Sequence, residues 1–149
     1  MNDKVILLVE DSRDDETLIK RALTKYRVAD KVLVAHDGEE AIDCLFNSSA
    51  QLPGKKCQPS LVLLDLKLPK IDGLEILRRI RDDNRTRLLP VVVLTSSDEE
   101  GDLIGSYDLG ANSYVRKPID FDEFIETVRQ VGTYWLSFNL TPDQYGSTT

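Results

Sequence analysis

The chain has 149 residues, of which 41% are apolar and 30% charged, so it can form one domain with a real core but is too short for two. Its 26 acidic residues outnumber its 19 Lys and Arg residues, which gives a formal net charge of -7. Because a nucleic-acid binder usually carries a basic face that neutralises phosphates, direct binding of DNA or RNA is disfavoured. The single histidine, His36, excludes a multi-histidine zinc site.

The hydropathy pattern argues against secretion and against membrane insertion. The N-terminal Met-Asn-Asp-Lys is charged and leads into only five apolar residues, which is far short of a secretory segment. No apolar run approaches the ~20 residues that a membrane span needs. The sequence therefore predicts a cytoplasmic protein without a membrane span.

Five short apolar runs, each bounded by polar, Gly or Pro residues, predict β-strands. In chain order they cover residues 5–9, 32–35, 61–64, 91–94 and, more weakly, 113–115. The first, third and fourth runs are almost continuously apolar, as is typical of strands that helices cover on both faces. These three strands are predicted to be central and parallel.

Apolar residues spaced for one face of a helix follow each strand. The pattern predicts helices over residues 18–26, 41–46, 76–80, 103–107 and 121–135. Asp37, followed by Glu40, resembles a capping box before the second helix, and Gly110 marks the end of the fourth. Five strand-helix alternations with right-handed crossovers predict an α/β fold, with an open twisted sheet and helices on both faces.

The remaining segments define the expected domain organisation. Residues 47–60 are polar and rich in Gly, Pro and Ser, which predicts an extended surface loop before the third strand. We expect one domain over residues 4–136. A short C-terminal tail, 137–149, follows it and is too short to fold into an output domain.

Polar residues stand where the predicted strands end. Glu10 and Asp11 follow the first strand, Asp65 the third, Thr95 the fourth and Lys117 the fifth. Ligands of such sheets bind at the carboxyl ends of the strands. Three converging carboxylates repel one another unless a cation neutralises them, and a small acidic pocket of oxygen ligands suits Mg²⁺. Since Mg²⁺ usually binds together with phosphate oxygens, the implied substrate is a phosphoryl group.

The residue types suggest a role for each position. Asp65 is the candidate nucleophile, because a carboxylate can form an acyl phosphate when a metal and an ammonium offset the phosphoryl charge. Lys117 would supply the ammonium, and the Thr95 hydroxyl could donate to a phosphoryl oxygen. The backbone carbonyl of Lys67 could complete the metal shell.

Four separated segments carry a family resemblance. They are Val-Glu-Asp-Ser at 9–12, Leu-Leu-Asp-Leu-Lys-Leu-Pro-Lys-Ile-Asp-Gly at 63–73, Val-Val-Val-Leu-Thr-Ser-Ser at 91–97 and Tyr-Val-Arg-Lys-Pro at 114–118. In this order they resemble a response-regulator receiver domain of two-component signalling. The resemblance implies a three-layer, doubly wound (βα)5 flavodoxin-like fold, whose parallel five-stranded sheet has the order 2-1-3-4-5.

The resemblance also implies a reaction. Asp65 would accept a phosphoryl group from the phosphohistidine of a sensor histidine kinase or a phosphotransfer protein. Mg²⁺ would be held by Glu10, Asp11, Asp65 and the carbonyl of Lys67, and Lys117 would contact the phosphoryl group. The protein would then be a phosphoacceptor switch rather than a turnover enzyme.

A conformational switch follows from the same resemblance. Thr95 would move toward the phosphoryl group and Tyr114 would rotate inward, which shifts an existing equilibrium between two states. The surface that changes would be the fourth helix, the fifth strand and the fifth helix, so that output passes through protein contacts. The resemblance further implies a cis peptide bond between Lys117 and Pro118.

A finer resemblance is to small stand-alone regulators of phytochrome-type kinases, which share the long loop before the third strand and a Tyr-Trp-Leu-like end. It implies a photoreceptor histidine kinase as phosphodonor. The large apolar residues near the C-terminus need cover, and two interpretations stay open: they pack back on their own domain, or they meet a second copy in a homodimer. These apolar residues are Tyr134, Trp135, Leu136, Phe138 and Leu140.

Two other functions are weighed against this one. A Mg²⁺-dependent phosphohydrolase would use the aspartyl phosphate as an intermediate, but its Asp-x-Asp motif is missing because Lys67 stands two residues after Asp65. A receiver-like adaptor that works without phosphorylation normally lacks the acidic pair, the aspartate or the lysine, and none of these is missing here. Taken alone, Thr95 and Tyr114 are also compatible with backbone capping and core packing.

Overall fold

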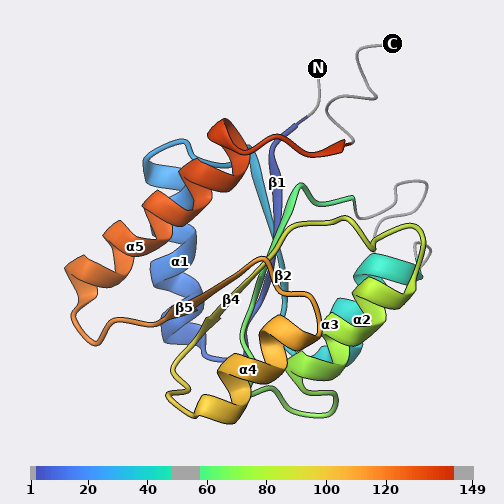
Figure 1. Ribbon diagram of the computed structural model, residues 1–149. Coiled ribbons are helices and arrows are strands. Elements are labelled where there is room, and N and C mark those ends of the chain that lie inside the picture. The colour runs from blue at the N-terminus through green and yellow to red at the C-terminus, as the bar shows by residue number, and fades with distance from the viewer. Residues whose placement is uncertain (1–2, 48–57, 143–149) are drawn as a thin grey trace.

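The computed structural model describes residues 3–47 and 58–142, which form one parallel sheet between two layers of helices (Figure 1). The central part of the predicted loop, 48–57, and the end of the predicted tail, 143–149, lie outside the described residues. Among the described residues, no helix is both long enough and apolar enough to cross a bilayer.

The sheet has five parallel strands in the order β2-β1-β3-β4-β5, which confirms the predicted fold class. The strands are β1 (Val5–Val9), β2 (Lys31–Ala35), β3 (Leu61–Leu64), β4 (Val91–Thr95) and β5 (Ser113–Arg116). Each lies within one residue of its predicted bounds. The fully buried strands are β3 and β4, together with nearly all of β1, because both faces of these strands are covered.

Five α-helices alternate with the strands. They are α1 (Arg13–Lys25), α2 (Gly38–Phe46), α3 (Gly73–Asp82), α4 (Glu100–Asp108) and α5 (Phe121–Thr133), and α5 continues into a π-helical turn, η1 (Tyr134–Phe138). In Figure 1, α1 and α5 cover one face of the sheet, and α2, α3 and α4 lie on the other side.

The alternation of side chains along the strands divides the core into two layers. Ile6 and Leu8 of β1 pack with α1 and α5, whereas Leu7 and Val9 pack with α2 and α3. These apolar contacts fix the strands rigidly, so the residues at their carboxyl ends are held at defined positions.

Four of the five α-helices begin with a side-chain cap close to the carboxyl edge of the sheet. The capping residues, whose side chains accept the amide hydrogen of the residue three positions later, are Ser12, Asp37, Asp72 and Asp120. The predicted cap of α2 by Asp37 is present at 2.8 Å, but the Glu40 carboxylate accepts from the His36 amide. It therefore does not complete the reciprocal bond of a capping box.

The fourth helix forms where the sequence predicts it, but its apolar residues are not core residues. Leu103, Ile104 and Tyr107 are 39%, 52% and 53% exposed, and the buried residue of α4 is Ser106. Of the C-terminal apolar residues, two follow the first interpretation, packing on their own domain, while the proposed homodimer contact stays a prediction. Trp135 and Leu136 pack on the core shared by α1 and α5, while Phe138 remains 72% exposed.

Candidate functional site

The pairing of β1 and β3 places two acidic residues next to each other at the carboxyl edge. Val9 is paired with Leu64, and the Asp65 amide donates to the Val9 carbonyl at 3.0 Å. Glu10 follows Val9 directly and donates its own amide hydrogen to the Ala35 carbonyl of β2 at 2.9 Å. The strand register therefore brings together carboxylates that are 55 residues apart in the sequence.

Three carboxylates form one cluster at this edge. Glu10, Asp11 and Asp65 each offer an oxygen, and these oxygens all lie within 4.8 Å of one another. Glu10 and Asp65 are buried, at 1% and 7% exposure, whereas Asp11 is exposed. A set of three carboxylate oxygens with one side open to solvent fits a hard divalent cation that keeps some of its water.

Lys117 lies against the same carboxylates. Its Nζ is 2.7 Å from Glu10 Oε1, 2.8 Å from Asp15 Oδ2 and 3.1 Å from Asp65 Oδ2, and its side chain is only 5% exposed. An ammonium has three N–H donors, so each donor meets a different carboxylate. The backbone amide of Lys117 donates to the Thr95 carbonyl at 2.8 Å, which fixes the residue to the end of β4.

The electrostatics of the site follow from burial and from these contacts. Burial raises the pKa of the Glu10 carboxyl to about 7, an effect that the nearby Asp65 charge reinforces and the Lys117 hydrogen bond only partly offsets. Burial works to lower the pKa of the Lys117 ammonium, but the carboxylates of Asp65, Asp15 and Glu10 outweigh it and raise that pKa. Lys117 therefore stays charged, and without a metal Glu10 is mostly protonated only below about pH 7.

Thr95 and Tyr114 are linked through Ser97. The fully buried Thr95 hydroxyl accepts from the Ser97 amide at 3.3 Å, and the Tyr114 hydroxyl donates to the Ser97 carbonyl at 3.2 Å. Thr95 ends β4, the strand beside β3, whereas Tyr114 lies within β5. The two predicted switch residues are thus both hydrogen-bonded to the backbone of Ser97.

Lys67 connects the loop after Asp65 to α4. Its amide donates to Asp65 Oδ1 at 3.4 Å, a long hydrogen bond. Its side chain reaches Asp102 Oδ2 at 3.3 Å and Glu99 Oε2 at 4.0 Å. The backbone of Lys67 is therefore next to Asp65, and the ammonium of Lys67 contacts acidic residues at the start of α4.

One expectation is not met. No peptide bond among the described residues is cis, so the bond between Lys117 and Pro118 is trans. Trans is the more stable isomer of most X-Pro bonds. In this isomer the Lys117 ammonium already lies 3.1 Å from Asp65, so its approach to the carboxylate does not require the cis form.

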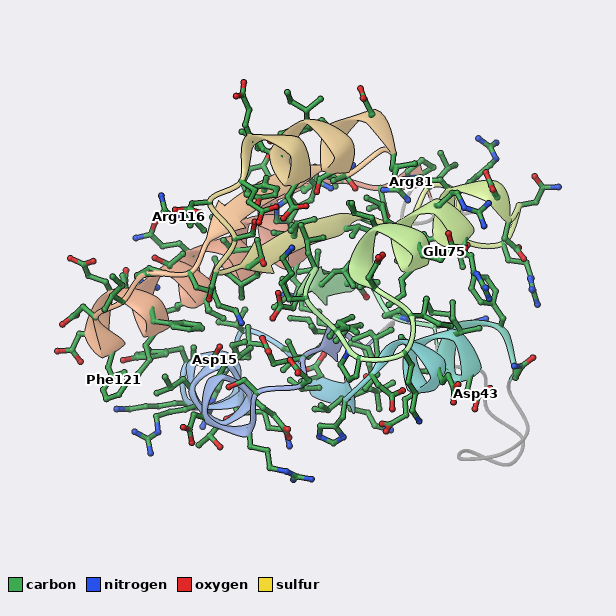
Figure 2. All side chains as sticks on the ribbon, turned by 90° about the horizontal axis from the view of Figure 1, so that it is seen from below. Asp15, Asp43, Glu75, Arg81, Arg116 and Phe121 are labelled. Carbon is green, nitrogen blue, oxygen red and sulfur yellow. The ribbon has the colours of Figure 1, made fainter. Side chains whose placement is uncertain are left out.

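Asp15 is a member of the site that the sequence did not reveal. It lies in the first turn of α1, and Figure 2, which views the molecule from below, labels it beside the strand ends. An acidic residue in the first turn is common because it favours the helix dipole, so its position alone carries no functional signal. Its contact with Lys117, 102 residues further on, depends on the tertiary fold.

Comparisons with known proteins point to one protein family. A family model, the response regulator receiver domain, matches residues 6–129. The chain is 40% identical over 138 residues to the probable methanogenesis regulatory protein FilR2 of Methanothrix harundinacea, covering 93% of this chain and 87% of the relative. It is 37% identical over 139 residues to response regulator Rcp1 of Synechocystis sp., covering 93% of both chains.

Known structures show the same fold over nearly the whole chain. The crystal structure of the Mn²⁺-bound form of response regulator Rcp1 superposes with a TM-score of 0.85 at 36% identity, covering 93% of this chain and 99% of that one. The phosphorylated cyanobacterial phytochrome response regulator RcpA gives a TM-score of 0.86 at 37% identity, with 95% and 99% coverage. From its matching family model, its homologues and its fold, this chain belongs to the response regulator receiver domain family.

Proposed function

We propose that Asp65 is the phosphoacceptor of a two-component signalling switch, with residues 4–136 as the switching domain. The observation that carries the proposal is the position of Lys117, whose Nζ lies 3.1 Å from Asp65 Oδ2 beside the carboxylates of Glu10 and Asp11. A nucleophilic carboxylate, a fixed ammonium and a cation site are the groups that phosphoryl transfer to an aspartate needs.

In the proposed reaction, an Asp65 oxygen attacks the phosphorus of a phosphohistidine. The new O–P bond forms as the P–N bond breaks, and the electron pair of that bond stays on the donor imidazole. Lys117 donates a hydrogen bond to a phosphoryl oxygen and balances its charge. Mg²⁺, held by Glu10, Asp11, Asp65 and the Lys67 carbonyl, would neutralise further charge on the phosphoryl oxygens.

Acceptance of the phosphoryl group would then shift the equilibrium between two conformations. The Thr95 hydroxyl would exchange the Ser97 amide for a phosphoryl oxygen. Because Tyr114 is bound to the carbonyl of the same Ser97, its contact would change as this segment moves. The resulting signal lies in the surface formed by α4, β5 and α5.

The proposed phosphodonor is a histidine kinase, of the phytochrome type. Support comes from the similarity to Rcp1 and to RcpA, a phytochrome response regulator. The loop after Lys117 also offers apolar contacts for a protein donor, since Ile119 is 100% exposed and Phe121, labelled in Figure 2, is 69% exposed. Exposed apolar groups of this size are typical of protein contacts.

The proposed homodimer would use the apolar side chains that remain exposed on α4 and after α5. Ile104 and Tyr107 lie on α4, and Phe138 and Leu140 follow α5, with exposures of 52% to 72%. Size-exclusion chromatography with light scattering, with and without beryllofluoride, tests this part. A monomer at all concentrations in both states would remove it.

Intact-mass spectrometry after incubation with Mg²⁺ and acetyl phosphate tests the phosphoacceptor. We expect a gain of one phosphoryl group that is absent in Asp65→Asn and is prevented by a chelator. Phosphorylation retained in Asp65→Asn would contradict the assignment. Rapid, steady release of phosphate from unrelated phosphomonoesters would instead favour a phosphohydrolase.

A further inference from the structure

Asp15 competes for the ammonium that the phosphoryl group needs. Lys117 Nζ is as close to Asp15 Oδ2, at 2.8 Å, as it is to Glu10 Oε1, at 2.7 Å, and closer than it is to Asp65 Oδ2, at 3.1 Å. With three N–H donors and three carboxylates, the ammonium has no donor left. A phosphoryl oxygen can therefore bind Lys117 only by displacing one of these partners or by sharing its donor.

The Asp15 carboxylate is not occupied by helix capping. Asp15 is the third residue of α1, a position from which an acidic side chain often returns to the amide of the capping residue. Here the Ser12 amide donates to Glu10 Oε2 at 3.1 Å instead. Only the backbone amide of Asp15 serves the cap, by donating to Ser12 Oγ at 3.3 Å, which leaves its carboxylate directed to Lys117.

Burial decides which carboxylate can give up Lys117 at the lowest cost. The side chains of Glu10 and Asp65 are only 1% and 8% exposed, so water could not readily replace the hydrogen bond that either would lose. The Asp15 side chain is 26% exposed, and water can replace the lost hydrogen bond. Asp15 is therefore the partner that exchanges most readily.

The charge of Asp15 opposes the phosphoryl group in a second way. It is not among the three carboxylates that lie within 4.8 Å of one another, so a cation held by that cluster would not be its direct partner. Once Lys117 turns to a phosphoryl oxygen, Asp15 remains as a negative charge near the newly added negative group. Both effects favour the state without a phosphoryl group.

We propose that Asp15 is a positioning residue that holds Lys117 in the unphosphorylated state and releases it when a phosphoryl group binds. Asp15 thereby lowers the affinity of the site for phosphoryl groups. This inference rests on the proposed function, because it assumes that Lys117 contacts a phosphoryl group attached to Asp65.

Binding of beryllofluoride, a mimic of the phosphoryl group, tests the inference at saturating Mg²⁺. We expect Asp15→Asn to bind it about fivefold more tightly than the wild type, the effect of losing one partly exposed ion pair. Asp14→Asn is the matched control: it removes the same charge from the same helical turn, but Asp14 is exposed. It should bind as the wild type does, and Asp15→Glu should restore much of the wild-type affinity.

A double-mutant cycle separates a role through Lys117 from a purely structural one. In a Lys117→Met background, Asp15→Asn should raise the affinity for beryllofluoride, as followed by amide NMR shifts, by clearly less than it does in the wild-type background, because only the direct charge repulsion is then removed. Unchanged or weaker binding by Asp15→Asn, or an equal gain in Asp14→Asn, would overturn the inference while leaving the phosphoacceptor intact. Failure of the wild-type protein to bind beryllofluoride with Mg²⁺ would overturn the proposed function as well.

Discussion

Lys67 Nζ lies 3.3 Å from Asp102 Oδ2 and so joins the loop after Asp65 to the first turn of α4. Asp102 also accepts a hydrogen bond from Ser97 Oγ at 2.5 Å, and the Ser97 carbonyl accepts from Tyr114. A continuous series of polar contacts thus runs from the loop after Asp65 to β5. It reaches Tyr114 without passing through the Thr95 side chain.

Lys67→Met should loosen α4 while leaving the metal site in place. The substitution removes the ion pair with Asp102 but keeps the backbone carbonyl that is proposed to bind Mg²⁺. We expect unchanged or slightly tighter Mg²⁺ binding by calorimetry, and faster amide hydrogen exchange in the first turn of α4. A large loss of Mg²⁺ affinity would show that the side chain, rather than the backbone, supports the cation.

Gly73→Ala should disturb Asp65, the proposed phosphoacceptor, through the backbone. A Cβ at this position would lie 2.4 Å from the Asp65 carbonyl oxygen and 2.7 Å from the Leu66 Cα, so the backbone that carries Asp65 would have to shift. We expect a loss of about 1–3 kcal/mol in the free energy of unfolding, measured in urea, together with weaker Mg²⁺ binding.

Gly101→Ala is the control for Gly73→Ala. A Cβ at Gly101, on α4, would meet nothing within 4 Å. Because Ala favours a helix over Gly, this variant should be neutral or more stable by up to about 1 kcal/mol, with unchanged Mg²⁺ binding. Equal behaviour of the two variants would contradict the steric explanation.

The metal-free protein should gain stability as the pH falls from about 7 toward 4.5. The pKa of the Glu10 carboxyl rises from 4.5 to about 7 on folding, so in this range the folded state binds more protons than the unfolded state. The contribution is complete below about 4.5 and is lost as the pH rises through about 7. Urea unfolding at several pH values, with a chelator present, measures this slope.

Glu10→Gln separates the contribution of the Glu10 carboxyl to the pH dependence of stability from the general effect of net charge. The amide cannot titrate, so the part of the slope due to Glu10 should disappear while the other carboxyls still contribute. An identical pH dependence in the variant and the wild type would show that Glu10 is ionised in the folded protein throughout this range.

Tyr114→Phe should weaken the contact to Ser97 without blocking phosphorylation. The hydroxyl donates one part-buried hydrogen bond, at 3.2 Å, whose loss costs about 1 kcal/mol in the free energy of unfolding. Incorporation of one phosphoryl group from acetyl phosphate should remain complete. Tyr107→Phe, on the exposed face of α4, is the control and should leave the stability unchanged; a similar loss in both variants would argue against a specific contact.

Local patterns in the sequence were sufficient to predict the five strands, and the family resemblance supplied their order. The continuously apolar run 61–64 is typical of a central strand, and parallel strands place their carboxyl ends at one edge, so the proximity of Glu10 to Asp65 followed from topology. Helical periodicity was less informative for α4. The apolar spacing of Leu103 and Tyr107 correctly predicted a helix, but both side chains face solvent, because a periodic pattern does not reveal what covers it.

The contact of Asp15 with Lys117 and the isomer of the Lys117–Pro118 bond lay beyond sequence patterns. An aspartate in the first turn of a helix is explained locally by the helix dipole, and only the tertiary contact with Lys117, which follows β5, distinguishes it from Asp14. The energies of the two X-Pro isomers differ too little for local sequence to decide between them.

The hydrogen bond from the Lys117 amide to the Thr95 carbonyl couples two functional groups mechanically. The Thr95 hydroxyl and the Lys117 ammonium belong to residues that one backbone hydrogen bond joins. A register shift between β4 and β5 would therefore change the position of one group relative to the other. A substitution that alters the β4–β5 register would therefore disturb both groups, whereas the exposed side chains of α4 take no part in this pairing.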